Sequence, residues 1–331
     1  MGPGPGAHVS FYDEIAENRR DSIVLVVIVA AVLGVLGFAI GYGVSGELAT
    51  GWIVLGLALV LAFVLSVGSY FGGDSLVLSA SQARQVDESS APQLLNVVRE
   101  LTLAAGLPMP KVYIIDDSAP NAFATGRDPE HASVAITTGL LDKLDREELQ
   151  GVFGHELSHV RNYDIRFALL VAVLVGSVAL IGDFFLRFTF WGGGPRRRDD
   201  RSGGGGGGQA IVFIIAIALA ILAPIFATFV QLAISREREY LADASSVALT
   251  RNPRGLEQAL AKIASDKEVL EVANRATQHL YIVNPIKKFE ARASGLMATH
   301  PPIIDRINRL RALSGDPPLD AASAAALQGL D

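Results

Sequence analysis

Cysteine is absent from the 331 residues of the chain. A disulfide framework is therefore excluded, and so is a metal site that uses thiolate ligands. A metal ion bound by this chain must be held by histidine and carboxylate side chains, and histidine is scarce, with six residues. The lack of cysteine does not assign a compartment, because it is compatible with either side of a membrane.

Charged residues are also few, at 19% of the chain, whereas half of the residues are hydrophobic and the mean hydropathy is +0.37. This composition is too apolar for an ordinary soluble domain. The formal net charge of −6 is mild and gives no reason to expect nucleic acid as a partner. Charges inside the apolar segments are too few to form a transport pathway, which argues against a transporter.

Two apolar segments near the N-terminus predict a transmembrane hairpin. Ile23–Val44 is uncharged and long enough to cross a bilayer, and Gly51–Gly73 has about the same length. A cleaved signal peptide is the rival interpretation, but the apolar core is too long and lacks a convincing small-residue cleavage site. Arg19 and Arg20 precede the first segment, and the linker carries only Glu47, so the positive-inside rule places the N-terminus and the chain after the hairpin in the cytoplasm.

A second apolar pair, residues 167–190 and 210–234, flanks a loop at residues 191–209. The pair predicts a third and a fourth membrane segment. Arg196-Arg197-Arg198 in the loop would then lie outside, against the usual charge bias. A shallow hairpin that does not fully cross and a pair of buried core helices both remain open as alternatives. The loop also contains six consecutive glycines, which is typical of a flexible linker or a disordered segment.

The stretch that begins at Asp145 predicts a helix with a metal-binding face. Asp145 and Glu148 have the spacing of a capping box. His155 and His159 are four residues apart, so their imidazoles lie on one helix face, about 5–6 Å apart at Cβ, and can reach one Zn²⁺. Glu156 lies next to this row and can hold a metal-bound water. The H-E-x-x-H arrangement is typical of zinc proteases, although two ordinary histidines on a solvated helix would produce the same letters.

A catalytic zinc site with two histidines needs a third protein ligand. Glu239 and Asp243 follow the last apolar segment and are four residues apart, so they share a helix face. Glu239 is predicted as the third ligand, and Asp243 is predicted to accept the N–H of a ligand imidazole. The alternative is that both are solvated charges in a surface turn rich in Arg and Glu.

Short extended segments precede the predicted metal-binding helix. Lys111–Ile115 is strand-like, and Asn121–Gly126 and Ser133–Thr137 are joined by a stretch with turn chemistry, which predicts a hairpin. The hairpin is either purely structural or offers an edge strand to which substrate backbone adds. In the second case the predicted substrate-binding residues are Asn121, Ala122, Phe123 and Ala124.

Four stretches, taken together, resemble one family. They are Asn121–Gly126, His155–Ile165, Ser235–Asp243 and Thr299-His300-Pro301-Pro302. Their order and the four apolar segments are similar to those of the HtpX-like membrane zinc metallopeptidases, which are related to the eukaryotic CAAX prenyl endopeptidases. The resemblance implies a gluzincin catalytic domain that binds one Zn²⁺ through His155, His159 and Glu239, with Glu156 as the catalytic base.

The resemblance also implies a biological setting, namely quality control of misfolded membrane proteins at a bacterial inner membrane, with protein or peptide substrates. It favours a place for His300 over the metal, where it would donate to the oxyanion, but a histidine before two prolines is also typical of a cap or a surface residue. A processing protease of narrow specificity is the first rival, and four apolar segments argue against its CAAX-type form. A non-catalytic zinc-binding scaffold is the second, and it is expected to lack Glu156.

The predicted fold is mainly α with a small β-sheet, and it is a gluzincin-type metalloprotease domain that carries about four transmembrane helices. The sequence does not indicate an oligomeric state. If the ligand helices continue unbroken into the adjacent apolar segments, the zinc lies roughly 7–12 Å from their membrane ends, just above the cytoplasmic face. The predicted regions are a cytoplasmic tail (1–21), a membrane hairpin (22–73), the first part of the catalytic domain (74–166), a second hairpin (167–234), the second part (235–315) and a C-terminal tail (316–331).

Overall fold

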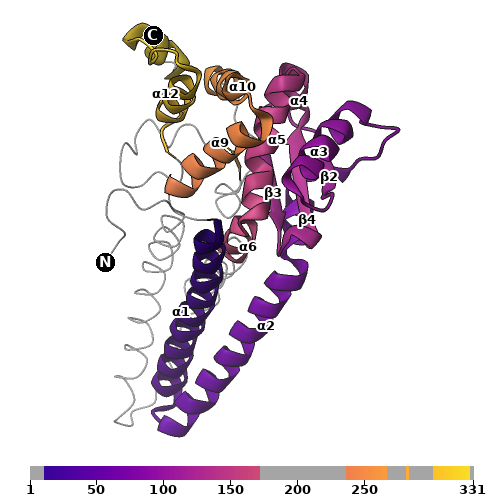
Figure 1. The fold of residues 1–331 in the computed structure, drawn as a ribbon. Helices are drawn as coiled ribbons and strands as arrows, with labels where there is room; N and C mark the ends of the chain where they lie inside the picture. The colour runs from indigo at the N-terminus through magenta and orange to yellow at the C-terminus, as the bar shows by residue number, and fades with distance from the viewer. Residues whose placement is uncertain (1–10, 172–235, 267–280, 283–300, 329–331) are drawn as a thin grey trace. The chain divides into compact units, whose positions relative to one another are not determined.

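The computed structural model describes residues 11–171, 236–266, 281–282 and 301–328 (Figure 1). The chain divides into two compact units. The first contains Met1–Arg20, Gly72–Leu169 and Ile234–Asp331, and the second contains Asp21–Phe71 and Leu170–Ala233. Residues far apart in the sequence therefore build the first unit. The fold is mainly helical with one small mixed sheet, as predicted from the sequence.

The second unit is described mainly through the helices α1 (Phe11–Ser45) and α2 (Leu48–Ala80), whose outer ends belong to the first unit and which only two residues connect. Small residues let the two backbones approach closely. A Cβ atom added at Gly37 would lie 2.9 Å from the Val54 carbonyl oxygen, and one at Gly41 would lie 2.7 Å from that of Thr50. Larger side chains at either glycine would push the helices apart.

Among the described helices, α2 alone meets the length and hydropathy expected of a membrane span. Only 11% of its most apolar window is buried, unlike the core helix of a soluble protein. It contains the predicted segment Gly51–Gly73 and extends beyond it at both ends. The predicted third and fourth segments lie almost wholly outside the described residues, so the number of four transmembrane helices stays a prediction.

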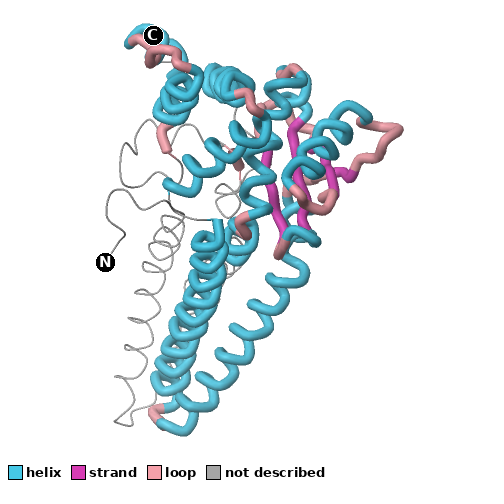
Figure 2. Tube along the Cα trace, in the orientation of Figure 1, coloured by secondary structure: helices cyan, strands magenta, loops and turns pink. Residues whose placement is uncertain are grey.

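The sheet lies in the first unit and has the strand order β1-β2-β4-β3 (Figure 2). Its strands are β1 (Arg84–Gln85), β2 (Lys111–Ile115), β3 (Ala122–Gly126) and β4 (Ala132–Thr137). Strands β3 and β4 pair antiparallel, with Phe123 opposite Ala135, which confirms the predicted hairpin. The hairpin needs a glycine at Gly126, because its φ is +139° and an added Cβ would collide with the His131 carbonyl.

Helix α5 (Arg146–Arg161) is the centre of the first unit, where it packs against α3, α9, α10 and β3. The predicted capping box is present, with Asp145 accepting from the Glu148 backbone and Glu148 accepting from that of Asp145. The other helices of this unit are α3 (Pro92–Ala105), α4 (Thr138–Lys143), α6 (Asp164–Leu170), α9 (Arg236–Thr250), α10 (Pro253–Ser265), α12 (Ile303–Ser314) and α13 (Ala321–Gln328), together with the short 3-10 helix η1 (Pro129–His131).

The condition for placing the zinc just above the membrane, an unbroken first ligand helix, is not met. Helix α5 ends at Arg161, Asn162 caps it, and Tyr163 adopts a left-handed φ of +64° before α6 begins. A left-handed residue cannot be part of a continuous α-helix. The distance from the metal to the membrane therefore cannot be obtained by counting residues along one helix axis.

Candidate metal centre

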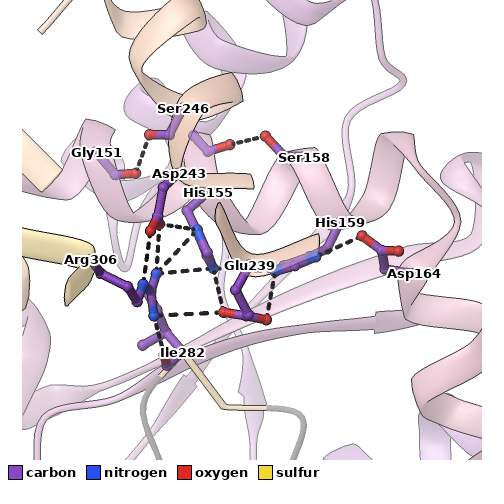
Figure 3. A network of polar contacts seen from close by, with 11 residues as sticks. Gly151, His155, Ser158, His159, Asp164, Glu239, Asp243, Ser246, Ile282 and Arg306 are labelled. Carbon is purple, nitrogen blue, oxygen red and sulfur yellow. Dashed lines mark hydrogen bonds and ion pairs between the residues drawn. The ribbon is translucent and has the colours of Figure 1, made fainter. Parts of the chain in front are cut away.

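Three side chains with metal-ligating atoms meet between α5 and α9. One ligand atom from each of His155, His159 and Glu239 lies within 4.8 Å of the others. The two Nε2 atoms are 3.2 Å apart, and each lies 3.6 Å from a carboxylate oxygen of Glu239 (Figure 3). The three residues that the sequence predicts as ligands are thus brought together.

A carboxylate on the far side of each imidazole determines which ring nitrogen faces the other two ligand residues. Asp243 Oδ1 lies 2.9 Å from His155 Nδ1, and Asp164 Oδ2 lies 2.8 Å from His159 Nδ1 (Figure 3). In the neutral form of each imidazole the proton therefore lies on Nδ1, and Nε2 has a lone pair directed toward the centre. Two such lone pairs beside a carboxylate form a site that can hold a cation, and two imidazoles with one carboxylate are ligands that suit zinc.

The contact between Asp243 and His155 is the one that the sequence predicted, whereas the role of Asp164 was not predicted. On an uninterrupted helix, five residues separate two side chains by about 140° around the axis, which would point Asp164 away from His159. The break at Asn162 and Tyr163 brings Asp164 back to the imidazole.

The two histidines differ in proton affinity. Burial lowers the pKa of His155, and the neighbouring charge of Arg306 lowers it further. Burial also acts to lower the pKa of His159, but the hydrogen bond to Asp164 and the charges of Glu239 and Asp164 outweigh it and raise that pKa to about 9. In the metal-free protein, a proton bound by this pair therefore resides on His159.

Glu156 is buried in α5 and faces the inner part of β3. Its Oε1 has no hydrogen-bond partner among the described residues, while the Ala124 backbone provides a hydrogen bond to the carboxyl group. Burial raises the pKa of Glu156 to about 7, with the charge of Glu239 adding to the rise. A carboxyl group with this pKa can both take up and release a proton near neutral pH.

The four predicted substrate-binding residues are all buried, and β3 lies at one end of the strand order. Part of its outer edge is already paired: the Ala122 carbonyl accepts the Ile282 N–H at 2.9 Å, and Phe123 forms an antiparallel bridge with Tyr281. The Asn121 side chain accepts the Ala122 N–H. The edge next to Glu156 therefore includes a contact that the sequence did not predict.

Arg306 is a buried polar residue of the centre that was not predicted from the sequence. It is 1% exposed and contacts Asp243, the Ile282 carbonyl and His155 (Figure 3). A signal was present, since Ile303, Arg306, Ile307 and Leu310 have the i, i+3, i+4, i+7 spacing of one buried face. His300 lies outside the described residues.

A helix that carries H-E-x-x-H, joined by a glutamate from a second helix, defines the class as a metallopeptidase. Residues 88–314 match the family model "Peptidase family M48", and the chain belongs to this family. It is a zinc metalloprotease, and the resemblance to the HtpX-like metallopeptidases is confirmed.

The similar curated proteins carry the name "Protease HtpX homolog". The protein of Streptococcus agalactiae serotype III (strain NEM316) is 47% identical over 300 residues, which are 91% of this chain and 99% of that protein. The protein of Listeria monocytogenes serotype 4b (strain CLIP80459) is 45% identical over 306 residues, covering 90% and 98% of the two chains. That of Dictyoglomus thermophilum is 41% identical over 302 residues, covering 91% and 94%.

Among solved structures, the crystal structure of S. mikatae Ste24p is similar with a TM-score of 0.47 and 18% sequence identity. The similarity covers 90% of this chain and 67% of that one.

Proposed function

We propose that the protein is a membrane-bound, zinc-dependent endopeptidase that hydrolyses peptide bonds near the cytoplasmic face of the membrane, in quality control of misfolded or damaged membrane proteins. The observation that carries the proposal is the convergence of His155, His159 and Glu239 beside the buried carboxyl group of Glu156. One Zn²⁺ per chain would be held by the first three residues. The quality-control role rests on the setting that the resemblance to the HtpX-like metallopeptidases implies.

The chemistry follows from these side chains. Zinc bound here would lower the pKa of a coordinated water and polarise the scissile carbonyl. Glu156 accepts the proton of the attacking water at its carboxylate and then donates it to the leaving amine. Asp243 and Asp164 keep the two imidazoles in the tautomer that presents Nε2. His300 remains a predicted oxyanion donor.

Strand β3 is proposed to align the substrate. The Ala124 backbone lies at the Glu156 carboxyl group, so an extended peptide added to this edge would bring its backbone to the proton acceptor. The proposed catalytic domain combines residues 74–166 with residues 235–315.

The membrane location is supported by helix α2. Trp52, Ile53, Leu57 and Phe63 are each more than 60% exposed, which in water would form an unfavourable apolar surface. A bilayer removes this cost, because lipid chains contact apolar side chains as well as a protein core does. The proposed topology is multi-pass, with the catalytic domain in the cytoplasm.

The metal assignment is tested by zinc content per chain in detergent-purified protein. Wild type and Glu257→Gln, a variant of a glutamate that pairs with Arg311, should contain about one zinc. Glu239→Gln should lose zinc and cleavage together, because one of three protein ligands is gone. Glu239→Gln that keeps zinc as wild type does would show that the ligand assignment is wrong.

Substrate class is tested with matched peptides, one set unfolded and unmodified and one set carrying a C-terminal lipid. The proposal predicts cleavage of the unfolded set at many positions. Cleavage confined to the lipidated set, at one position, would instead assign a narrow processing function.

A further inference from the structure

Arg306 on α12 is the largest side chain among the fully buried ones of the described residues. A guanidinium keeps its charge under all ordinary conditions, so burying it is costly unless its donors are paired. Every partner that accounts for its burial belongs to the metal centre or to the segment beside β3 (Figure 3). This distinguishes Arg306 from Arg309 on the same helix, which is exposed and stacks on the Tyr240 ring.

The Asp243 carboxylate is held at both oxygens. Arg306 Nε donates to Oδ2 at 2.9 Å and Nη2 donates to Oδ1 at 2.7 Å, a two-point geometry that lysine cannot reproduce. Because the carboxylate cannot rotate, Oδ1 stays 2.9 Å from His155 Nδ1. The 3.3 Å separation of Nη2 and Nδ1 is then a contact between two donors that share Oδ1.

The remaining nitrogen of the guanidinium contacts the segment beside β3. Arg306 Nη1 donates to the Ile282 carbonyl at 2.9 Å and lies 3.6 Å from Glu239 Oε2. The N–H of the same Ile282 donates to Ala122 on β3. One guanidinium therefore links a ligand's acceptor on α9 with the backbone that covers part of the β3 edge.

We propose that Arg306 is a positioning residue, which locks Asp243 so that His155 presents Nε2 to the metal, and which holds Ile282 against β3. The inference rests on the proposed zinc site. The alternative is a purely electrostatic role for Arg306. The two roles predict opposite changes in zinc affinity when Arg306 is replaced. A fixed positive charge 3.6 Å from Glu239 repels a metal cation, so removing it should strengthen zinc binding if charge is all that matters. Removing a positioning residue should weaken zinc binding instead.

The test measures zinc dissociation constants by chelator competition, and the absorption spectrum of the Co²⁺-substituted protein, in full-length protein in detergent. Arg306→Gln and Arg306→Lys should both bind zinc about 10- to 100-fold more weakly than wild type. Their Co²⁺ bands should shift, because the His155 ligand is no longer held in one orientation. Arg309→Gln should match wild type in both measurements.

A double-mutant cycle tests whether Arg306 acts through Asp243. If it does, Arg306→Gln combined with Asp243→Asn should bind zinc no more weakly than Asp243→Asn alone. Additive losses would overturn the proposal, as would zinc binding by Arg306→Gln that equals or exceeds wild type, or full recovery by Arg306→Lys.

Thermal unfolding of the zinc-free variants separates positioning from scaffolding. If Arg306→Gln and Arg306→Lys are unfolded while Asp243→Asn is folded, Arg306 has a structural role and the proposal is contradicted. If wild type itself binds no zinc, the proposed function fails and this inference fails with it. Normal zinc binding by wild type with unaffected Arg306 variants overturns this inference alone.

Discussion

His155 and His159 lie one turn apart on α5, yet their surroundings shift their proton affinities in opposite directions. His155 has Arg306 next to its acceptor, whereas His159 faces the carboxylates of Asp164, Glu239 and Glu156. Glu156 adds a second group that holds a proton more tightly in the folded protein than in the unfolded chain. The metal-free centre is therefore a site where protons take the place of a cation.

At this scale we predict that the metal-free protein loses stability as the pH rises from about 6.5 to 9. Below about pH 6.5 the lowered pKa of His155 gives a contribution that rises with pH and opposes that of Glu156. The folded pKa values of Glu156 and His159 are about 7 and about 9, above their ordinary values of 4.5 and 6.5. For both groups, the contribution to stability is greatest below the unfolded pKa and falls as the pH rises through the folded pKa. The share of Glu156 is at most roughly 3 kcal/mol.

The measurement is the thermal unfolding midpoint of zinc-free protein at several pH values. Glu156→Gln, which does not titrate, should remove the part of the fall below about pH 7 and leave the part due to His159. A wild type and a Glu156→Gln variant with the same pH dependence would show that Glu156 does not hold the proton.

Residue chemistry was predictable from the sequence where helical spacing alone sets the geometry. The predicted residues form two pairs, His155 with His159 and Glu239 with Asp243, and the members of each pair are four residues apart on one helix. A zinc site needs a third protein ligand, which indicates that the two helices are neighbours. Asp164 was not predictable, since its contact with His159 depends on a left-handed residue at Tyr163. Arg306 was missed because a charged residue in an apolar stripe is normally assigned to the solvent side.

Among the elements, α5 depends on close backbone packing. A Cβ atom at Gly151 would lie 2.5 Å from the backbone nitrogen of Leu256 on α10, and the Gly151 carbonyl accepts the Ser246 hydroxyl of α9 at 2.7 Å. The first contact holds α5 against α10, and the second holds α5 against α9, the helix that carries Glu239.

We therefore predict that Gly151→Ala destabilises the protein by about 1–3 kcal/mol, because the added methyl group forces α10 away from α5. Gly72→Ala on α2 is the matched control, since no described atom lies within 4 Å of its added Cβ. Thermal unfolding midpoints compare the two. Equal midpoints for Gly151→Ala and wild type would mean that α5 and α10 do not approach each other this closely.

Elements with a complete local signal were predicted well. The capping box at Asp145, the strand Lys111–Ile115 and the β3–β4 hairpin all have their determinants within a few residues. The parallel pairing of β2 with β4, the two-residue strand β1 and the end of α5 at Asn162 were not predicted. Each of these depends on contacts with distant parts of the chain rather than on local propensity.

At the scale of the whole molecule, the absence of cysteine allows topology to be mapped with single engineered thiols. The proposed orientation predicts that Glu47→Cys, in the connection between α1 and α2, reacts with a membrane-impermeant maleimide in intact cells. Leu103→Cys on α3, which is 76% exposed, should react only after the membrane is opened. Labelling of Leu103→Cys in intact cells would place the catalytic domain on the opposite side.

The fold class was predictable because helical and strand-like segments were correctly distinguished, and the family because four motifs occur in the right order. The distance between the site and the membrane was not predictable, since the prediction depended on an unbroken helix that the structure does not contain.

The most direct test of the central claim pairs zinc content with casein cleavage in wild type and Glu156→Gln. Glu156 lies beside the three ligand residues but is not one of them, so the variant should keep about one zinc per chain. Cleavage should fall by about 10²- to 10⁴-fold, as expected for a lost general base. Glu156→Gln that cleaves as well as wild type, or wild type that contains no zinc without chelators, would contradict the assignment of this centre.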